Sequence, residues 1–525
     1  MTTINNPILR GFNPDPTILR VGDDYYIMTS SFEWWPGTPV YHSRDLVHWE
    51  MIGHALTNPA AVDLRGVIDS AGIWAPSLSF SDGLFHLIYT VVRTRVGDFK
   101  DVHNYLVTAS DILGPWSEPI YLNSSGFDPS LFHDDDGRKW LVNMEWDFRK
   151  GQPRFGGIVL QEYDPTAKKT IGPITKILTK PCLIEGPNLY KRNGLYYLML
   201  AEGGTGWNHG ISMARSSSVD GPYELDPQHS VITSRDDESL PLQKAGHGEL
   251  VETAAGEWIL AHLASRPVGP DRRCMMGRET CLQRVEWTTD GWLRLVGGGP
   301  VTLLSPDSPT SLEPHPFPTV PTRDDFDEPG LGVQWSSLRV PFNDSWASLA
   351  ERPGWLRLRG RESMISLFEQ SLVAKRLEEC RAVAETRLDY APEHFTQMAG
   401  LICYYDTRTH YYLRVTHDAV VGRVLGVVLS DDGKYDDLLA TNISIADWPA
   451  MYLRAAIDGV ALQFSASPNG ETWQPVGPVL DASKLSDDYG QGLHFTGAFV
   501  GLCAQDLRGT KLHADFDYFD INYHR

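Results

Sequence analysis

One pattern recurs five times in the N-terminal half of the chain. Each copy starts with a polar or aromatic residue that is followed within two positions by Pro or Gly, then has a short apolar run, a turn and a second, aromatic-rich run. The copies begin at Asp15, Trp74, Asp128, Glu185 and His247, with spacings of 59, 54, 57 and 62 residues. Three of the turns carry Asp-Gly or Asn-Gly, in which glycine tolerates the positive φ of a tight hairpin. A repeat of this length fits a blade of four short strands, so the sequence predicts a five-bladed β-propeller.

The first residues of the five copies are expected to meet, because equivalent positions of propeller blades converge on the central axis. Three of them, Asp15, Asp128 and Glu185, are carboxylic acids. Hydrolysis of a glycosidic bond needs two carboxyl groups in opposite protonation states, and a third one nearby can raise the pKa of the acid. An Asp before Pro also commonly caps a turn. The equivalence of all three positions therefore favours glycoside hydrolysis, while the residues alone do not distinguish the acid from the base.

Other residues near these positions have chemistry that suits a sugar. His247 would, at the mouth of the axis, hold a hydrated cation or brace a carboxylate, and a structural hydrogen bond is the alternative. Arg278 carries a fork-shaped donor that suits sugar hydroxyls, with a surface salt bridge as the alternative. Aromatic rings either stack on sugar faces or fill the core, and the candidates are Phe32, Trp34, Trp35, Trp74 and Trp146.

The remainder of the chain lacks the repeat. Six prolines lie between residues 306 and 321, a density that favours an extended, semi-rigid linker. Beyond it, apolar and polar residues alternate, as in residues 453–464, and helical periodicity is scarce throughout. The sequence thus predicts an all-β protein, with a propeller over residues 1–304, a linker over 305–322 and a β-sandwich over 323–525.

Composition narrows the class of partner. Lys and Arg total 46 against 67 Asp and Glu, a formal net charge of −21, which excludes a basic face for nucleic acid. The start of the chain has no signal-peptide pattern, and no apolar run reaches the roughly 18–20 residues of a membrane span. The six cysteines have no metal-site spacing. We therefore expect a cytoplasmic protein without membrane contact. The stretch Glu202-Gly-Gly-Thr-Gly lacks dinucleotide-binding spacing and is interpreted as a flexible loop.

Several segments that contain these residues resemble glycoside hydrolase family 43, and most closely its intracellular two-domain β-xylosidases. The likeness covers almost the whole chain, including Phe495-Thr-Gly-Ala-Phe-Val-Gly near its end. The other segments are Gly11-Phe-Asn-Pro-Asp-Pro-Thr-Ile, Ser31-Phe-Glu-Trp-Trp-Pro-Gly, Ile73-Trp-Ala-Pro-Ser, Gly126-Phe-Asp-Pro-Ser-Leu, Glu185-Gly-Pro, Ala245-Gly-His-Gly-Glu and Gly277-Arg-Glu-Thr.

This resemblance implies a five-bladed propeller joined to a concanavalin-like sandwich. It also implies an inverting exo-hydrolase that releases D-xylose from the non-reducing ends of β-1,4-xylooligosaccharides, without a required cofactor. By motif match, Asp15 would be the general base, Glu185 the general acid, and Asp128 the group that orients the acid and raises its pKa. Relatives commonly form oligomers, so a dimer or tetramer is expected.

The resemblance further assigns the sugar-binding residues. Arg278 would bind xylose hydroxyls, with Phe32 and Trp74 lining the first subsite. His247 would lie on the propeller axis, where many relatives hold calcium, and would contact the ion through waters. Phe495, from the sandwich, would reach over the pocket and help to close it.

Three other functions compete with this reading. An α-L-arabinofuranosidase, or an enzyme with both activities, would use the same scaffold because the two sugars can present similar hydroxyls. A retaining fructan hydrolase would carry Asn-Asp-Pro-Asn, Arg-Asp-Pro and Glu-Cys, where this chain has Asn-Pro-Asp-Pro, Phe-Asp-Pro and Glu-Gly. A noncatalytic glycan-binding propeller would have no need for three carboxylates.

Overall fold

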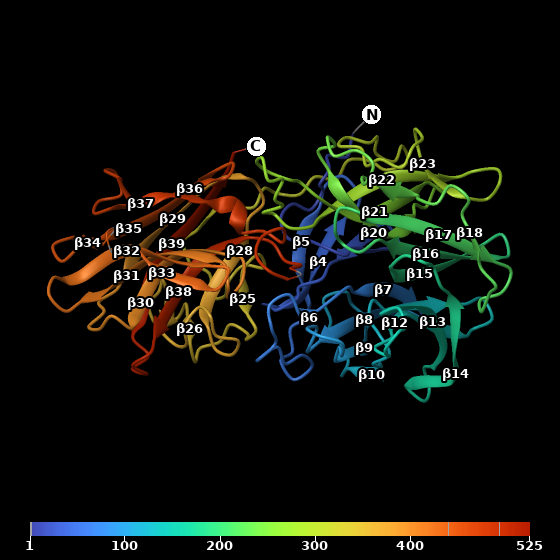
Figure 1. The fold of residues 1–525 in the computed structure, drawn as a ribbon, viewed down its shortest axis with the longest axis horizontal. Helices are drawn as coiled ribbons and strands as arrows, with labels where there is room; N and C mark the ends of the chain where they lie inside the picture. Colours follow the sequence, from blue (N-terminus) through green and yellow to red (C-terminus); the bar gives the residue numbers. More distant parts are fainter. Residues whose placement is uncertain (1–2, 439, 441, 493, 525) are drawn as a thin grey trace.

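The computed structural model describes residues 3–524 except 439, 441 and 493, and it is built from two β-rich bodies that lie side by side (Figure 1). The predicted all-β fold is confirmed: five small sheets form a propeller, and two larger sheets form a sandwich. Among the described residues, none of the helices is both long and apolar enough to cross a lipid bilayer.

Each blade is an antiparallel sheet made from strands that are consecutive in the chain, except that blade I omits β3 (Trp34–Trp35), which joins the sandwich. Blade I contains β1 (Thr17–Val21), β2 (Asp24–Met28), β4 (Gly37–Ser43) and β5 (Glu50–Leu56). Blade II contains β6 (Gly72–Ile73), β7 (Ser77–Ser81), β8 (Leu84–Val92), β9 (Val102–Ala109) and β10 (Ile120–Asn123). Blade III contains β11 (Ser130–His133), β12 (Lys139–Trp146), β13 (Phe155–Asp164) and β14 (Lys169–Leu178). Blade IV contains β15 (Ile184–Arg192), β16 (Leu195–Glu202), β17 (Gly210–Ser216), β18 (Glu224–Leu225) and β19 (Ile232–Thr233). Blade V contains β20 (Gln243–Glu252), β21 (Trp258–Ser265), β22 (Glu279–Trp287) and β23 (Leu293–Leu295).

One strand of each blade (β2, β8, β12, β16 and β21) carries apolar side chains into the interior of the propeller. These side chains are fully buried and form part of the propeller core, and examples from the five blades are Ile27, Leu87, Val142, Leu198 and Leu260. The hairpin between the first two strands turns at glycines with positive φ, such as Gly137 (φ 87°) and Gly194 (φ 78°), as the Asp-Gly and Asn-Gly signals predict.

The N-terminal segment joins the first blade to the last one. Ile8 donates its backbone N–H to the carbonyl of Thr280 on β22 at 2.9 Å, and Ile4 donates to Pro306 at 2.9 Å. The side-chain amide of Asn6 donates to Leu282 at 2.8 Å and accepts from its N–H at 2.9 Å. These bonds close the ring without a strand exchanged between blades.

The sandwich encloses its own core between two antiparallel sheets. The first sheet has the order β26 (Ala347–Ser348), β27 (Leu356–Arg359), β39 (His513–Tyr523), β29 (Arg381–Asp389), β35 (Met451–Asp458), β36 (Ala461–Ser467) and β37 (Gln474–Asp481), with β24 (Arg323–Asp324) on β39. The second has the order β3 (Trp34–Trp35), β25 (Ser336–Leu338), β28 (Ser371–Arg376), β38 (Phe499–Asp506), β30 (Gln397–Tyr404), β31 (His410–Asp418), β32 (Gly422–Asp431) and β33 (Lys434–Asp437), with β34 (Ile443–Ser444) on β32. The alternation predicted around residues 453–464 corresponds to β35 and β36, whose inward residues include the buried Leu453 and Phe464.

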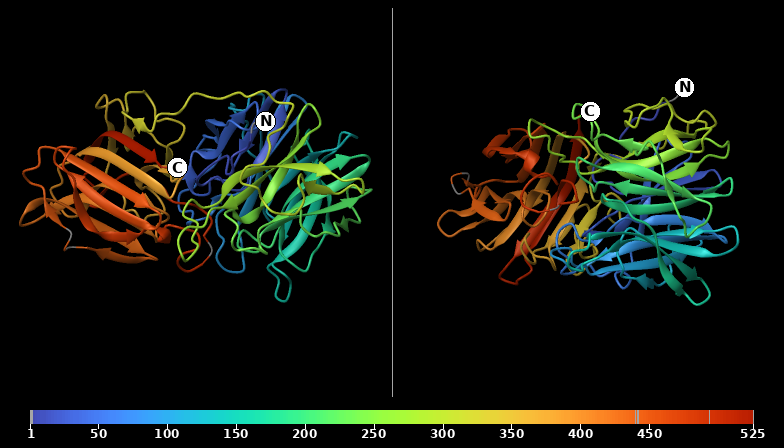
Figure 2. Two further views of the ribbon diagram at one scale, coloured as in Figure 1. Left: turned by 90° about the horizontal axis from the view of Figure 1, so that it is seen from above. Right: turned by 45° about the vertical axis from the view of Figure 1, so that its right-hand side comes forward.

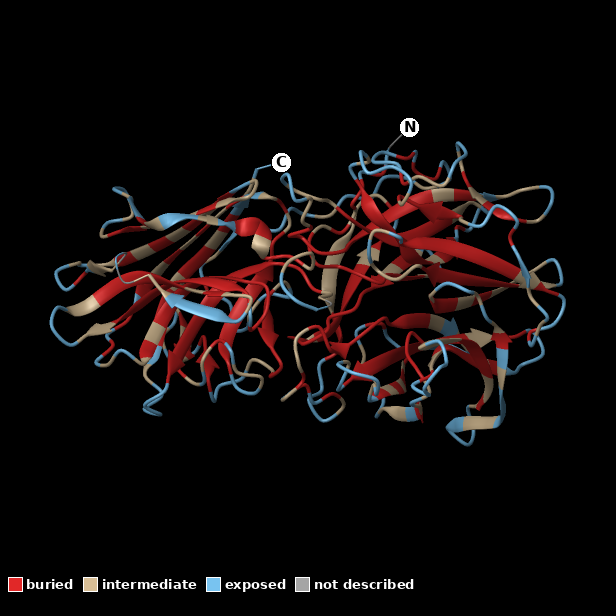
Figure 3. Cartoon of the chain, in the orientation of Figure 1, coloured by how far each residue is buried: buried red, intermediate tan, exposed pale blue. Residues whose placement is uncertain are grey.

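The two domains share a buried junction. Strand β3, from the propeller part of the sequence, pairs with β25 at the edge of the second sandwich sheet. The Trp34 ring stacks on Phe499 with centroids 3.7 Å apart, and the buried Arg339 binds Asp69 at 2.7 Å. Buried residues continue from one domain into the other (Figure 3). This packing fixes the sandwich against one side of the propeller.

The connection between the domains is irregular and mostly exposed, and it crosses from the propeller to the sandwich as one long segment (Figure 2). His315 in this segment donates its backbone N–H to Asp45 at 2.7 Å. The limits of residues 305–322 for this linker stay a prediction.

Candidate active site

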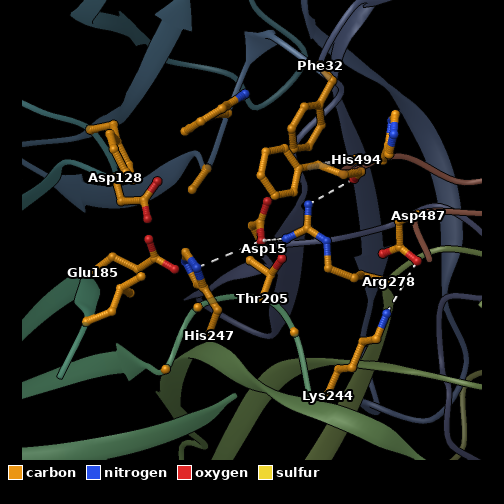
Figure 4. Close-up of a pocket in the computed structure, with 18 of the residues that line it drawn as sticks. Asp15, Phe32, Asp128, Glu185, Thr205, Lys244, His247, Arg278, Asp487 and His494 are labelled. Carbon is orange, nitrogen blue, oxygen red and sulfur yellow. Dashed lines mark hydrogen bonds and ion pairs between the residues drawn. The ribbon is translucent and has the colours of Figure 1, made fainter. Parts of the chain in front are cut away.

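A cavity of about 510 Å³ lies between the propeller and the loops of the sandwich that face it. Nine of the site residues predicted from the sequence line this cavity: Asp15, Phe32, Trp74, Asp128, Trp146, Glu185, His247, Arg278 and Phe495. The stacking candidates Trp34 and Trp35 do not line it, because both are buried in β3 where it pairs with the sandwich. Figure 4 shows the carboxyl groups of Asp128 and Glu185 facing one another, with Asp15 beside Arg278. The equivalent repeat positions therefore meet in one pocket, as predicted.

The backbone at the start of the inner strands turns the carboxylates toward the axis. Asp15 and Asp128 both have φ of 53°, a left-handed conformation that Asp tolerates better than most residues. Each is followed by Pro and lies two residues before its strand, β1 or β11. Glu185 lies within β15, where the pairing with β16 is irregular between Glu185 and Asn188. Local backbone distortion thus accompanies all three carboxylates.

Asp15 is held as a carboxylate. Its side chain is buried, and it accepts hydrogen bonds from Ser30 Oγ at 2.7 Å and from Arg278 Nη1 at 2.5 Å. Burial alone would raise the pKa of Asp15, but the charge of Arg278, with smaller effects from His247 and Ser30, holds the pKa below its ordinary value. Asp15 is therefore ionised at neutral pH and can accept a proton.

Asp128 and Glu185, in contrast, form a pair of carboxyl groups that retains a proton. Burial and the negative charges of Glu185 and Asp15 raise the pKa of Asp128 well above its ordinary value. Burial and the charge of Asp15 raise the pKa of Glu185 to about 7, against the opposing charges of Arg278 and Lys100. A negative charge on one carboxyl group disfavours ionisation of its neighbour, so the pair retains a proton near neutral pH. The pocket thus contains both a carboxylate and a proton donor.

Rings and a guanidinium form the inner wall of the pocket. Arg278 is buried, donates from Nη2 to the carbonyl of Phe495 at 3.0 Å, and lies 5.6 Å from the Phe32 ring centroid. The centroids of Trp74 and Phe495 are 5.7 Å apart, and Trp74 donates from Nε1 to the carbonyl of Ser70 at 3.2 Å. Such a wall offers stacking surfaces on one side and hydrogen-bond donors on the other, which suits a pyranose or furanose ring.

Trp146 forms a second aromatic group with Phe155 and Lys100. The Trp146 and Phe155 centroids are 5.5 Å apart, and Lys100 Nζ lies 4.5 Å from the Trp146 ring centroid. Partial burial lowers the pKa of Lys100 to about 8. The positive charge of Lys100 reaches Glu185 and lowers its pKa, so this group and the proton donor are coupled.

Sequence reasoning missed several residues that line the pocket. They are Ala75, Lys100, Phe127, Phe155, Leu183, Lys244, Asp487, Asp488, Gly492, His494 and the Gly203–Gly206 stretch with Thr205. The Gly-rich stretch was interpreted only as a flexible loop, yet it follows the second strand of the fourth copy, a position that borders the axis. The sandwich residues carried no comparable signal, because they lie outside the repeat.

His247 does not offer calcium a direct site. Its Nδ1 lies 3.8 Å from Asp15 Oδ1. Its ring packs so closely on Gly186 that a Cβ added at Gly186 would lie 2.9 Å from Cε1 of the ring. Burial lowers the pKa of His247, which makes the imidazole neutral. Calcium takes six to eight oxygen ligands. Within the described part of the chain, the side chains spaced for a metal are Cys274, Asp487 and Asp488, a set without His247. A contact between His247 and calcium through water molecules stays a prediction.

Comparison with known proteins identifies the family of the chain. A family model described as "Glycosyl hydrolases family 43" matches residues 4–293, and one described as "Beta xylosidase C-terminal Concanavalin A-like domain" matches residues 323–522. The chain is 48% identical to "Xylosidase/arabinosidase 43B" of Humicola insolens, over 99% of this chain and 97% of that protein. It is 45% identical to "Beta-xylosidase" of Bacillus subtilis, over 98% and 99%. A crystal structure of xylan beta-1,4-xylosidase from Bacillus halodurans is 54% identical, with a TM-score of 0.97 over 99% of this chain and 100% of that one. Since the first model spans more than half of the chain and these relatives span nearly all of it, the chain belongs to glycosyl hydrolases family 43.

Proposed function

We propose that the protein is an exo-acting, inverting β-1,4-xylosidase that releases D-xylose from the non-reducing ends of xylooligosaccharides. The observation that carries the proposal is the split in protonation: Arg278 keeps Asp15 ionised, while burial and like charge keep a proton on the pair Asp128 and Glu185. The β-xylosidase names of the relatives support the choice of sugar.

In the proposed reaction, Asp15 accepts a proton from a water molecule as that water attacks the anomeric carbon. Glu185 donates its proton to the glycosidic oxygen, so the leaving sugar departs as a neutral alcohol. Asp128 orients Glu185 and, through its own charge, keeps the proton on it until the bond breaks. One displacement with a base on one side and an acid on the other inverts the anomeric centre.

The proposed binding mode follows from the walls of the pocket. Arg278 binds hydroxyls of the terminal xylose, whose ring packs against Phe32 and Trp74. Trp146 lies beyond the acid and would contact the next sugar. Phe495, from the sandwich, forms part of the wall around the first sugar. A wall from the second domain leaves room for a chain end rather than for the middle of a chain, which explains the exo mode.

A second candidate is α-L-arabinofuranosidase activity in the same pocket. The name of the Humicola insolens relative, "Xylosidase/arabinosidase 43B", favours it as a side activity. The predicted oligomer, the cytoplasmic location and calcium on the axis stay predictions, and no step of the proposed reaction uses a metal.

Parallel hydrolysis of two chromogenic glycosides tests the proposed function. We expect p-nitrophenyl β-D-xylopyranoside to be cleaved with a higher kcat/KM than p-nitrophenyl α-L-arabinofuranoside, because the relatives are named first for xylose. The Glu185→Gln variant, purified in the same way and assayed on a xylooligosaccharide, is the control for contaminating glycosidases of the expression host. Dominant arabinoside cleavage would make the second candidate the main function, and cleavage of neither glycoside would contradict both.

A further inference from the structure

Lys244 is a buried cation at the boundary of the pocket that the proposed reaction does not use. It lies on β20, three residues before His247, and its side chain is 3% exposed. Its Nζ lies 2.6 Å from Asp488 Oδ1 and 3.4 Å from Asp487 Oδ1. Both aspartates come from the sandwich, in the segment after the short 3₁₀ helix η2 (Ala482–Lys484). Lys244 therefore links the propeller to the sandwich segment that also forms the pocket wall.

Lys244 also contacts the second loop of the pocket. Its Nζ lies 5.0 Å from the ring centroid of Trp207, a distance typical of a cation–π contact. Trp207 directly follows the Gly203–Gly206 stretch, which lines the pocket with Thr205. Figure 4 shows Lys244 reaching up to Asp487, with Thr205 and Arg278 nearby. One ammonium group thus holds a loop from each domain.

Lys244 supplies a counter-charge for both aspartates. Asp488 also accepts the backbone N–H of Cys274 at 2.9 Å, so it joins a second propeller segment to the sandwich. Burial and the adjacent Asp488 raise the pKa of Asp487 to about 7 even though Lys244 opposes the shift. The same lysine holds the pKa of Asp488 below its ordinary value despite burial. Without Lys244, two neighbouring, partly buried aspartates would lose their counter-charge, and uncompensated charge away from solvent is destabilising.

A few residues after Asp488, the same part of the sandwich contacts residues of the proposed sugar site. Phe495 donates its backbone N–H to Ser70 Oγ at 3.0 Å and accepts from Arg278 at 3.0 Å. Arg278 in turn binds Asp15. A shift of the segment around Asp487 would therefore displace Phe495 and the Arg278 nitrogen atoms that are proposed to bind the sugar.

We propose that Lys244 is a positioning residue that holds two loops, residues 203–208 and 485–492, in the arrangement that encloses the first sugar. This role rests on the proposed function for its substrate, but the anchoring of the loops does not. Because the loops contact substrate and product in the ground state, losing the anchor weakens the binding of both more than it slows the chemical step.

Lys244→Met tests the proposal, since it keeps the aliphatic stem and removes the charge. We expect KM for p-nitrophenyl β-D-xylopyranoside and the inhibition constant of D-xylose to rise about tenfold, with kcat lowered by less than about threefold. Lys244→Arg is expected to restore part of the loss. If Lys244 acts through Asp488, adding Asp488→Asn to Lys244→Met should raise KM little further. Unchanged KM and inhibition constant in Lys244→Met would overturn the proposal.

Lys139→Met is the matched control. Lys139 is also a buried propeller lysine with a carboxylate partner, Asp82 at 3.0 Å, but it does not line the pocket. This variant should keep the wild-type KM, and its loss of thermal stability should be smaller than that of Lys244→Met because the Asp82 side chain is 77% exposed. Asp488→Asn, which breaks the same link from the sandwich side, gives the answer if Lys244→Met does not fold, and it is expected to raise KM as well.

Hydrogen–deuterium exchange separates this proposal from the proposed function, since it needs no substrate. We expect faster exchange in peptides that cover residues 203–208 and 485–492 of Lys244→Met, and wild-type exchange there in Lys139→Met. An inactive wild type with this exchange pattern would contradict the xylosidase and keep the anchor. Unchanged exchange in both loops would contradict the anchor whatever the activity.

Discussion

Replacing Glu185 with Ala is expected to lower kcat/KM for xylobiose by about 10³-fold, within the range that general acid catalysis supplies. Xylobiose releases a sugar alkoxide that needs a proton as the bond breaks. The loss should be much smaller for a xyloside with an activated leaving group, such as dinitrophenol, which departs without protonation. The measurement is the ratio of kcat/KM values for the two substrates in wild type and variant.

The pH dependence of Glu185→Ala gives an independent check. In the wild type, activity on xylobiose should fall as pH rises through the pKa of the acid, because only protonated Glu185 donates. Burial places that pKa at about 7. On the activated xyloside, the variant should lose this alkaline fall, since no acid is left to titrate. Equal losses on both leaving groups, with the alkaline fall retained, would mean that Glu185 is not the acid.

Replacing Asp15 with Asn is expected to lower kcat by about 10³-fold or more on both kinds of leaving group. The amide keeps the size of the side chain and can still accept from Arg278, but it cannot take a proton from water. Because water must be activated whatever group departs, leaving-group activation should not rescue this variant. Rates on xylobiose and on the dinitrophenyl xyloside measure the effect.

Ser30→Ala is the matched control for Asp15→Asn. Ser30 Oγ donates to Asp15 at 2.7 Å and, unlike Arg278, is not among the residues that line the pocket. Its loss removes one hydrogen bond that lowers the pKa of Asp15 and should cost far less than the loss of the base. If Asp15→Asn recovered its activity on the activated xyloside, Asp15 would be the acid and Glu185 the base, opposite to the roles proposed here.

The repeat explains why the grouping of the three carboxyl groups in one pocket could be predicted. Equivalent positions in a propeller share one axis, so sequence spacing alone brought Asp15, Asp128 and Glu185 together. Alternating apolar residues likewise predicted strands such as β35 and β36. In both cases the structure follows from a local or periodic pattern that each segment carries by itself.

The missed features depend on contacts between distant segments. Strand β3 pairs with β25, about 300 positions later in the chain, and Lys244 meets Asp488 across 244 positions. Neither contact leaves a periodic trace, since each is a single pairing that only the packing of the two domains creates. The place of Phe495 at the pocket was predicted from resemblance and not from spacing, for the same reason.

The anomeric form of the first product tests the central claim most directly. Wild-type enzyme is mixed with p-nitrophenyl β-D-xylopyranoside, which releases one xylose per turnover, and proton NMR follows the anomeric signals of that xylose before mutarotation equilibrates them. The proposed single displacement, with Asp15 as base and the proton on Glu185, predicts that α-D-xylopyranose appears first. Initial release of β-D-xylopyranose would contradict this mechanism, because retention requires a covalent intermediate and a nucleophilic carboxylate in place of the base.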